Sequence, residues 1–154
     1  MSFEDDFSGR ETEMSKKDIL EITDKPIVPE QVIAKIKGED CGAVVTFTGK
    51  VRGRSGDKKV LYLEHGVSGE APEKMLKDIV GEIRKRWDVG EIAFCYRKGK
   101  IGPGEITIVI AVAAIHRQEA FAVCEYAVDR LKQKVMTKEG RENGEVRVGK
   151  KGSA

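Results

Sequence analysis

Alternation of apolar and polar positions predicts several short strands in this chain of 154 residues. Residues 42–49 read GAVVTFTG and place Ala43, Val45 and Phe47 on one face, a pattern typical of a half-buried strand. Residues 105–114 read EITIVIAVAA, which is apolar on both faces, so this strand is predicted to lie in the centre of its sheet. Further strands are predicted over residues 60–64, 92–96 and 145–148.

A period of 3.6 residues predicts two long helices. In residues 71–87 apolar residues recur at helical spacing from Leu76 to Trp87. A longer helix is predicted from about residue 117 to 135, and a short one over 29–37, where Pro29 suits the first turn. The predicted apolar stripe of the longer helix contains Phe121, Cys124, Val128, Leu131 and Val135.

The order of these elements predicts one α+β domain, in which helices pack on one face of a mostly antiparallel sheet. Residues 1–15 hold five acidic residues and a single arginine, and this charge with low hydrophobicity predicts a disordered extension. The folded domain is predicted over residues 16–150, and residues 151–154 are predicted to be a flexible tail.

Composition argues against several classes of protein. Twenty-eight Lys and Arg against 26 Asp and Glu leave a net charge of +2, which argues against a bulk nucleic-acid binder. Three cysteines without a CxxC pair argue against a disulfide framework or a structural zinc site, so we expect reduced thiols. No apolar stretch approaches the ~18 residues of a membrane span, and the acidic start does not resemble a secretory signal. A cytoplasmic protein is therefore expected.

The common catalytic motifs are absent from the sequence. No GxxxxGK[ST], GxGxxG, GxSxG or HExxH is present, and the two histidines, His65 and His116, share no metal-ligand spacing with a cysteine. We therefore expect no metal site. The remaining candidate residues for chemistry are cations.

Two segments place cations at the end of a predicted strand. His116 and Arg117 open the long helix, whose N-terminus suits a phosphate or carboxylate, although a capping arginine and a partly buried histidine are the simpler interpretation. The loop 50–59 is rich in glycine and carries Lys50 and Arg52, so its backbone could approach an anion. An ordinary hairpin loop with solvated charges is the alternative there.

Lys132 lies at the edge of the apolar stripe of the long helix. A lysine partly desolvated at such an edge, near other cations, has a depressed pKa and can act as a base or nucleophile. The alternative is that its aliphatic part packs on the protein while the ammonium remains in water.

Several short motifs follow one another in a specific order between residues 22 and 149. They are GAVVTFTGKVR at 42–52, Arg86-Trp87, GKIGPGE at 99–105, Ala114-Ile115-His116-Arg117, Ala120-Phe121, Asp129-Arg130-Leu131-Lys132 and GEVRVG at 144–149. In this order and spacing, the chain resembles the large, catalytic subunit of molybdopterin synthase.

The resemblance implies an α/β hammerhead fold and a sulfurtransferase of molybdenum cofactor biosynthesis that converts cyclic pyranopterin monophosphate into molybdopterin. Sulfur would arrive as a thiocarboxylate on the C-terminal Gly-Gly of a small ubiquitin-like carrier. The resemblance further implies a homodimer with a carrier at each end, a heterotetramer, and a reaction that needs no metal or redox cofactor.

The same resemblance assigns roles to individual cations. Lys132 matches an essential lysine and Lys138 a second one, while Arg52 matches a substrate-contacting arginine. His116 and Arg117 match an anion-binding pair, which we expect to converge with Arg52 on the phosphate of the substrate. The predicted catalytic residues are Lys132 and Lys138, and the predicted substrate-binding residues are Lys50, Val51, Arg52, His116, Arg117, Lys132 and Lys138.

Two alternatives to the synthase remain open from the sequence. Before Lys138 the family usually carries a proline, an aromatic residue and a tryptophan, where this chain reads Val135-Met136-Thr137 and is one residue shorter. This difference would suit a non-catalytic paralogue that binds the carrier without converting the substrate. A small RNA- or nucleotide-binding module that uses the basic loop 50–59 and the basic tail is the other alternative.

Overall fold

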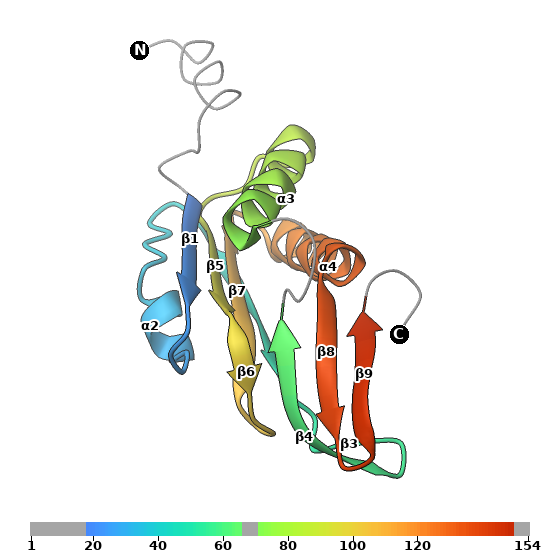
Figure 1. Ribbon diagram of the computed structural model, residues 1–154. Coiled ribbons are helices and arrows are strands. Elements are labelled where there is room, and N and C mark those ends of the chain that lie inside the picture. The colour runs from blue at the N-terminus through green and yellow to red at the C-terminus, as the bar shows by residue number, and fades with distance from the viewer. Residues whose placement is uncertain (1–17, 66–70, 150–154) are drawn as a thin grey trace.

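The computed structural model describes residues 18–65 and 71–149, which form two β-sheets and three helices (Figure 1). The predicted extension 1–15 and the predicted tail 151–154 lie outside the described residues. In the described ranges no helix is long and apolar enough to cross a membrane. Most strand pairs are antiparallel, which confirms the α+β prediction.

The larger sheet has the strand order β1-β5-β7-β2. Strand β7 is buried along almost its whole length because it pairs with β5 on one side and β2 on the other, as its apolar sequence predicts. Strands β1 and β5 pair in parallel, and the other two pairs are antiparallel. The strands are β1 (Asp18–Thr23), β5 (Ile92–Arg97), β7 (Ile106–Ala114) and β2 (Ala43–Lys50).

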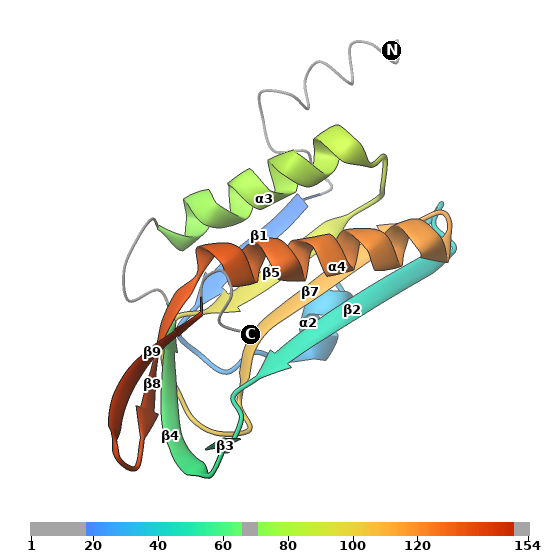
Figure 2. The same ribbon diagram turned by 90° about the vertical axis from the view of Figure 1, so that its right-hand side faces the viewer.

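Helices cover both faces of the larger sheet. The helices α3 (Pro72–Arg86) and α4 (Arg117–Lys134) lie on one face, and the short α2 (Pro29–Ile33) packs on the other (Figures 1 and 2). Helix α2 ends before the predicted residue 37. The backbone N–H groups of residues 37 and 38 donate to the Glu91 carboxylate at 3.0 and 2.6 Å, which takes them out of the helical pattern.

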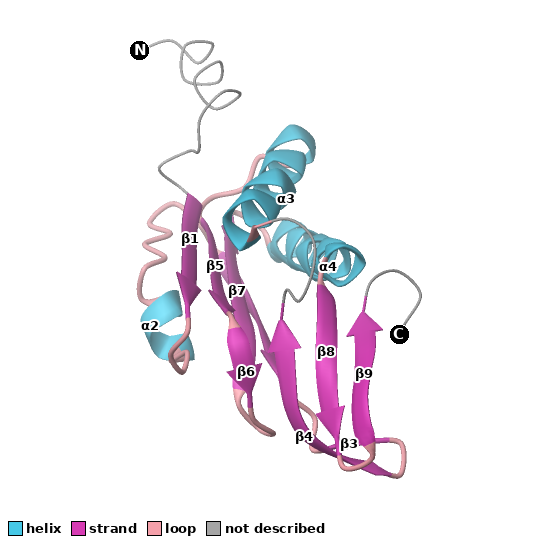
Figure 3. Ribbon diagram, in the orientation of Figure 1, coloured by secondary structure: helices cyan, strands magenta, loops and turns pink. Residues whose placement is uncertain are grey.

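The smaller sheet has five strands (Figure 3). Four of them lie in the order β3-β4-β8-β9, and the fifth, β6, pairs with β4. Strand β8 occupies part of what the sequence suggested to be only a basic tail. Its inward residues Thr137 and Glu139 are polar although buried, so the segment has no apolar alternation to reveal it. The strands are β3 (Arg54–Ser55), β4 (Lys58–His65), β6 (Gly99–Ile101), β8 (Met136–Arg141) and β9 (Gly144–Gly149).

The buried stripe of α4 differs in part from the predicted one. Phe121 is 59% exposed, so its predicted place in the core is wrong. The stripe is centred on small residues, which let the helix approach β2 and β7 closely, and Phe121 lies about 100° around the helix from Ala120. The buried residues of α4 are Ala120, Val123, Cys124, Ala127 and Leu131.

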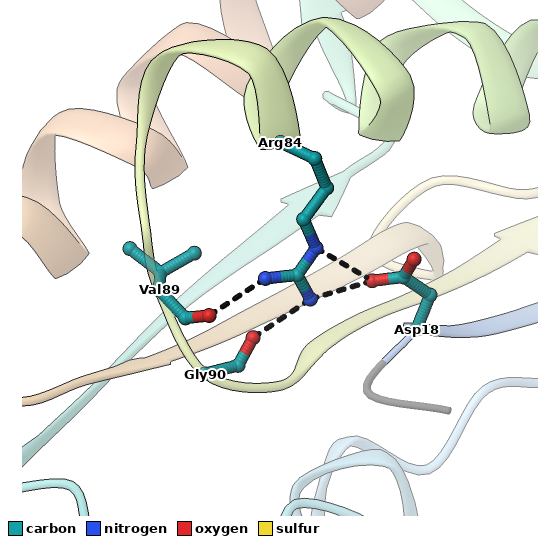
Figure 4. Close-up of polar contacts among 4 residues, drawn as sticks. All are labelled: Asp18, Arg84, Val89 and Gly90. Carbon is teal, nitrogen blue, oxygen red and sulfur yellow. Dashed lines mark hydrogen bonds and ion pairs between the residues drawn. The ribbon is translucent and has the colours of Figure 1, made fainter. Parts of the chain in front are cut away.

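A buried ion pair connects α3 to the first strand (Figure 4). The Arg84 guanidinium donates to the Asp18 carboxylate at 2.6 Å and to the carbonyl oxygens of Val89 and Gly90 at 2.6 and 2.8 Å. The two side chains are only 10% and 2% exposed. Because the charges are paired and hydrogen-bonded, their burial is tolerated, and the pair fixes β1 beside the end of α3.

Candidate active site

The course of α4 divides the predicted site residues into two groups. Strand β2 pairs antiparallel with β7, with Ala43 opposite Ala114 and Lys50 opposite Ile106. Helix α4 begins directly after β7 and returns along β2 toward the smaller sheet (Figure 2). The start of α4 therefore lies beside the start of β2, and the end of α4 lies toward the end of β2.

His116 and Arg117 lie at the first of these two ends. His116 is the N-cap residue of α4, its side chain makes no capping hydrogen bond, and both side chains are exposed. The expected partial burial of His116 is therefore wrong. Gly42 shows how closely β2 passes this point, because a Cβ on Gly42 would lie 2.8 Å from the carbonyl oxygen of Ile115.

The other predicted site residues lie toward the second end of α4, where the chain enters the smaller sheet. Lys132 stands sixteen positions after His116 on one straight element, so at 1.5 Å per residue the two are about 24 Å apart. Arg52 follows the end of β2, whereas His116 and Arg117 lie beside its start, so within a single chain the expected convergence on one anion is not met. The residues of this second group are Lys50, Val51, Arg52, Lys132 and Lys138.

Val51 anchors the segment that follows β2. Its side chain is 3% exposed in a small core with Val60, and its backbone N–H and carbonyl bond Glu105 and Gly104 at 2.9 and 2.8 Å. The fold thus uses both the side chain and the backbone of Val51. Its neighbours on either side, Lys50 and Arg52, are exposed and free to meet a ligand.

The basic loop after Arg52 is a β-hairpin. Gly56 occupies the turn with φ +62°, and the Arg54 guanidinium donates to the carbonyl oxygen of Asp57 at 3.0 Å. Residues 54 and 55 then pair with Lys59 and Lys58. This geometry favours the ordinary hairpin over a loop shaped around a phosphate.

Lys132 is exposed in the last turn of α4 and makes no ion pair within residues 18–65 and 71–149. Of the two interpretations of Lys132, the exposure in the single chain favours the one in which the ammonium remains in water over partial desolvation. Its neighbour Leu131 faces the core, and one step along a helix turns a side chain about 100° away from that direction.

Lys138 lies on β8, only four residues after the end of α4, and its side chain is 31% exposed. Its ammonium nitrogen is 3.8 Å from Oε1 of Glu64 and 3.7 Å from Oε1 of Glu145. No local sequence pattern indicates these two carboxylates, because they come from β4 and β9 and meet Lys138 only through the strand register.

His65 is another polar residue to which the sequence interpretation assigned no role. Its ring stacks on Tyr96 at 4.9 Å between centroids, and its Nδ1–H donates to the carbonyl oxygen of Arg97 at 3.0 Å. Burial lowers the pKa of His65, which keeps the ring neutral. This contact joins β4 of the smaller sheet to β5 of the larger one.

Comparisons with known proteins identify relatives of this chain by sequence. The family model described as MoaE protein matches residues 22–134. The molybdopterin synthase catalytic subunit of Bacillus subtilis is 37% identical over 132 residues, which cover 84% of this chain and 84% of that protein.

Solved structures agree with the sequence comparisons. The crystal structure of molybdopterin synthase from Staphylococcus aureus superposes with a TM-score of 0.74 at 35% identity, covering 88% of this chain and 98% of that one. The complex of subunits 1 and 2 of the molybdopterin-converting factor from Helicobacter pylori shares the fold at a TM-score of 0.64 and 16% identity, covering 82% of this chain and 88% of that one.

Proposed function

Because the chain belongs to the MoaE protein family, we propose that it transfers sulfur to cyclic pyranopterin monophosphate to make molybdopterin. Molybdopterin synthesis is the function of the family, and the roles of individual residues are our proposal. The observation that supports these roles best is the position of Lys132 and Lys138 on either side of the junction between α4 and β8. Arg52 follows the end of β2, and β2 runs along α4 toward this same end of the helix (Figure 2).

The side chains at this junction suit the chemistry of the reaction. The substrate is an anion, which the exposed Lys50 and Arg52 can bind through charge and hydrogen bonds. Replacing oxygen by sulfur requires proton transfers and stabilisation of anionic intermediates. We assign the proton transfers to Lys132 and the stabilisation of negative charge to Lys138.

A second copy of the chain completes this site. His116 and Arg117 are about 24 Å from Lys132 in one chain, so they can serve the same reaction only in a neighbouring subunit. Strand β2 is an edge of the larger sheet, and three large apolar side chains near the start of α4 or β2 are exposed. A two-fold pairing of chains that runs the two α4 helices in opposite directions would bring the start of one helix to the end of the other. The exposed residues are Val44, Ile115 and Phe121.

The sulfur donor is a small partner subunit. The H. pylori structure that shares this fold is a complex of two different subunits, which supports a small-subunit partner. We infer that the partner is a ubiquitin-like carrier with a C-terminal Gly-Gly thiocarboxylate, and that the assembly is a heterotetramer. Because the carrier brings the sulfur, the proposed reaction needs no resident metal or redox cofactor. None of the three cysteines forms a disulfide, which favours a cytoplasmic location.

A reconstituted reaction tests this function. Purified protein is mixed with thiocarboxylated carrier and cyclic pyranopterin monophosphate, and molybdopterin is measured as its fluorescent oxidised derivative. We expect turnover by the wild type and a loss of about 10²-fold or more in Lys132→Ala. Lys77→Ala, an exposed lysine of α3, is the matched control and should keep full activity. A wild type that binds the carrier but makes no molybdopterin would instead support the non-catalytic paralogue.

A further inference from the structure

One face of the smaller sheet places Lys138 between two carboxylates. Glu64 is the direct cross-strand partner of Lys138 on β4, and Glu145 is its diagonal neighbour on β9. The ammonium nitrogen lies 3.8 Å from an oxygen of the first and 3.7 Å from an oxygen of the second. Lys138 is therefore held from two sides rather than paired once.

Glu145 is itself fixed by a contact that does not involve Lys138. The Tyr62 hydroxyl donates a short hydrogen bond to Oε2 of Glu145, while the Lys138 ammonium approaches the other oxygen. This hydrogen bond lowers the pKa of Glu145 and raises the pKa of Tyr62. At neutral pH the tyrosine thus remains a donor and Glu145 remains an anion.

The position of Tyr62 depends in turn on a glycine of β8. A Cβ on Gly140 would lie 2.1 Å from the Tyr62 ring, so the ring lies flat on the glycine backbone. The ammonium of Lys100 is 4.7 Å from the ring centroid, in cation–π contact. Contacts with Gly140 and Lys100 thus position the half-buried ring that holds the Glu145 carboxylate.

A purely structural role explains this arrangement poorly. Arg147 stands directly opposite Lys138 in the β8–β9 register, and like charges in facing positions destabilise a strand pair. Partly exposed ion pairs contribute little stability, in the range of about 0–1 kcal/mol. Lys132, by contrast, makes no ion pair within the described part of the chain. The two lysines of the site thus differ in their ion pairs within the described residues.

We propose that Glu64 and Glu145 are positioning residues that hold the Lys138 ammonium in place for the sulfur-transfer reaction, an inference that rests on the function proposed above. An ammonium held between two carboxylates has a defined position, from which it can act on negative charge that develops in the substrate. We assign the proton transfers to Lys132, which has no carboxylate partner among residues 18–65 and 71–149. The two lysines therefore have different tasks.

Amine reactivity tests the positioning without any turnover. The free protein is treated with a trace of acetic anhydride, and mass spectrometry gives the acetylation rates of Lys138 and Lys132. In the wild type Lys138 should react more slowly than Lys132. Glu64→Gln and Glu145→Gln should each make Lys138 react about two- to fivefold faster, as expected for loss of one partly exposed ion pair. Tyr62→Phe should change the rate in the same direction.

The matched control for this measurement is Glu125→Gln, which makes the same chemical change at an exposed position of α4. It should leave both acetylation rates unchanged. Equal rates for Lys138 and Lys132 in the wild type, or an unchanged Lys138 rate in both Gln variants, would overturn the positioning. This outcome does not depend on whether the protein makes molybdopterin.

Steady-state kinetics then test the use of this positioning in the reaction. The double variant of Glu64 and Glu145 to Gln should lose about tenfold or more in kcat with the KM for the carrier unchanged, because the lysine is displaced rather than the partner surface altered. Lys138→Arg should keep more activity than Lys138→Met, since charge is what is required. Wild-type kcat in the double variant would overturn the inference, whereas an inactive wild type would overturn the proposed function alone.

Discussion

The cations at the start of α4 and those just beyond its end differ in their contacts with other side chains. At its start, His116 and Arg117 are exposed, and the His116 side chain makes no capping hydrogen bond. Beyond its end, Lys138 is enclosed by Glu64 and Glu145, one of which is fixed by a tyrosine. Under the function proposed above, one half of the site is formed within each chain and the other half comes from a neighbouring chain. A short chain can in this way supply two remote groups of residues to one reaction.

Of the changes considered, replacing Gly140, which lies beneath the Tyr62 ring, should disturb the surroundings of Lys138 most strongly. In Gly140→Ala the new Cβ would meet the aromatic ring at 2.1 Å, so the ring must leave the position from which it holds Glu145. We expect a loss of about 1–3 kcal/mol in the free energy of unfolding, typical of overpacking. Urea denaturation measures this loss.

Gly81→Ala is the matched control for that substitution. Gly81 lies within α3 with open space around it, so an added Cβ meets nothing within 4 Å. Alanine there should raise the stability by about 0.5–1 kcal/mol through helix propensity. Equal effects of the two substitutions would mean that Tyr62 is not held against Gly140 in solution.

A smaller effect is expected from pH at His65, which joins the two sheets. Burial lowers the pKa of His65 below its usual 6.5, so the folded protein binds this proton less readily than the unfolded chain. The free energy of unfolding should therefore be fully retained above pH 6.5 and decrease as the pH falls below it. Urea denaturation at a series of pH values measures the slope.

His65→Gln should remove this contribution to the slope, because glutamine does not titrate. The same loss of stability on acidification in the wild type and in His65→Gln would contradict the contact between the ring and Tyr96. This prediction tests only the contact between the two sheets at His65, and it does not involve the residues at the start of α4.

Hydrophobic patterning predicted three strands of the larger sheet, β2, β5 and β7, and the two long helices that cover it, because these elements bury apolar faces. It missed β1, most of whose residues are only half-buried. The same reasoning missed β8, whose buried positions are Thr137 and Glu139, and it misplaced Phe121 by one helical step. Strands β3 and β6 contain only two and three residues, too few for a periodic pattern. The missed strands of the smaller sheet are thus either buried through polar residues, as in β8, or too short for a pattern, as in β3 and β6, whereas β4 and β9 were predicted.

For the site, motif order in the sequence pointed to candidate cations but not to how they are grouped. The length of α4 separates Lys132 from His116. The register of β2 and β7 adds that Arg52 follows the strand end that lies far from His116. Glu64 and Glu145 carry no local signal, because their meeting with Lys138 depends on the pairing of three strands. Contacts between side chains on different strands can be predicted only when the strand topology is known, whereas the positions of helices and strands can be predicted from the local pattern.

Complementation between two inactive variants tests most directly whether one site needs two chains. The double variant His116→Ala/Arg117→Ala is mixed with Lys132→Ala, subunits are allowed to exchange, and molybdopterin formation is measured. Random exchange places half of the chains in mixed dimers with one intact site of two, so about one quarter of the wild-type activity should return. No recovered activity, with mixed dimers detected by native mass spectrometry, would contradict the account, as would full activity of the double variant alone.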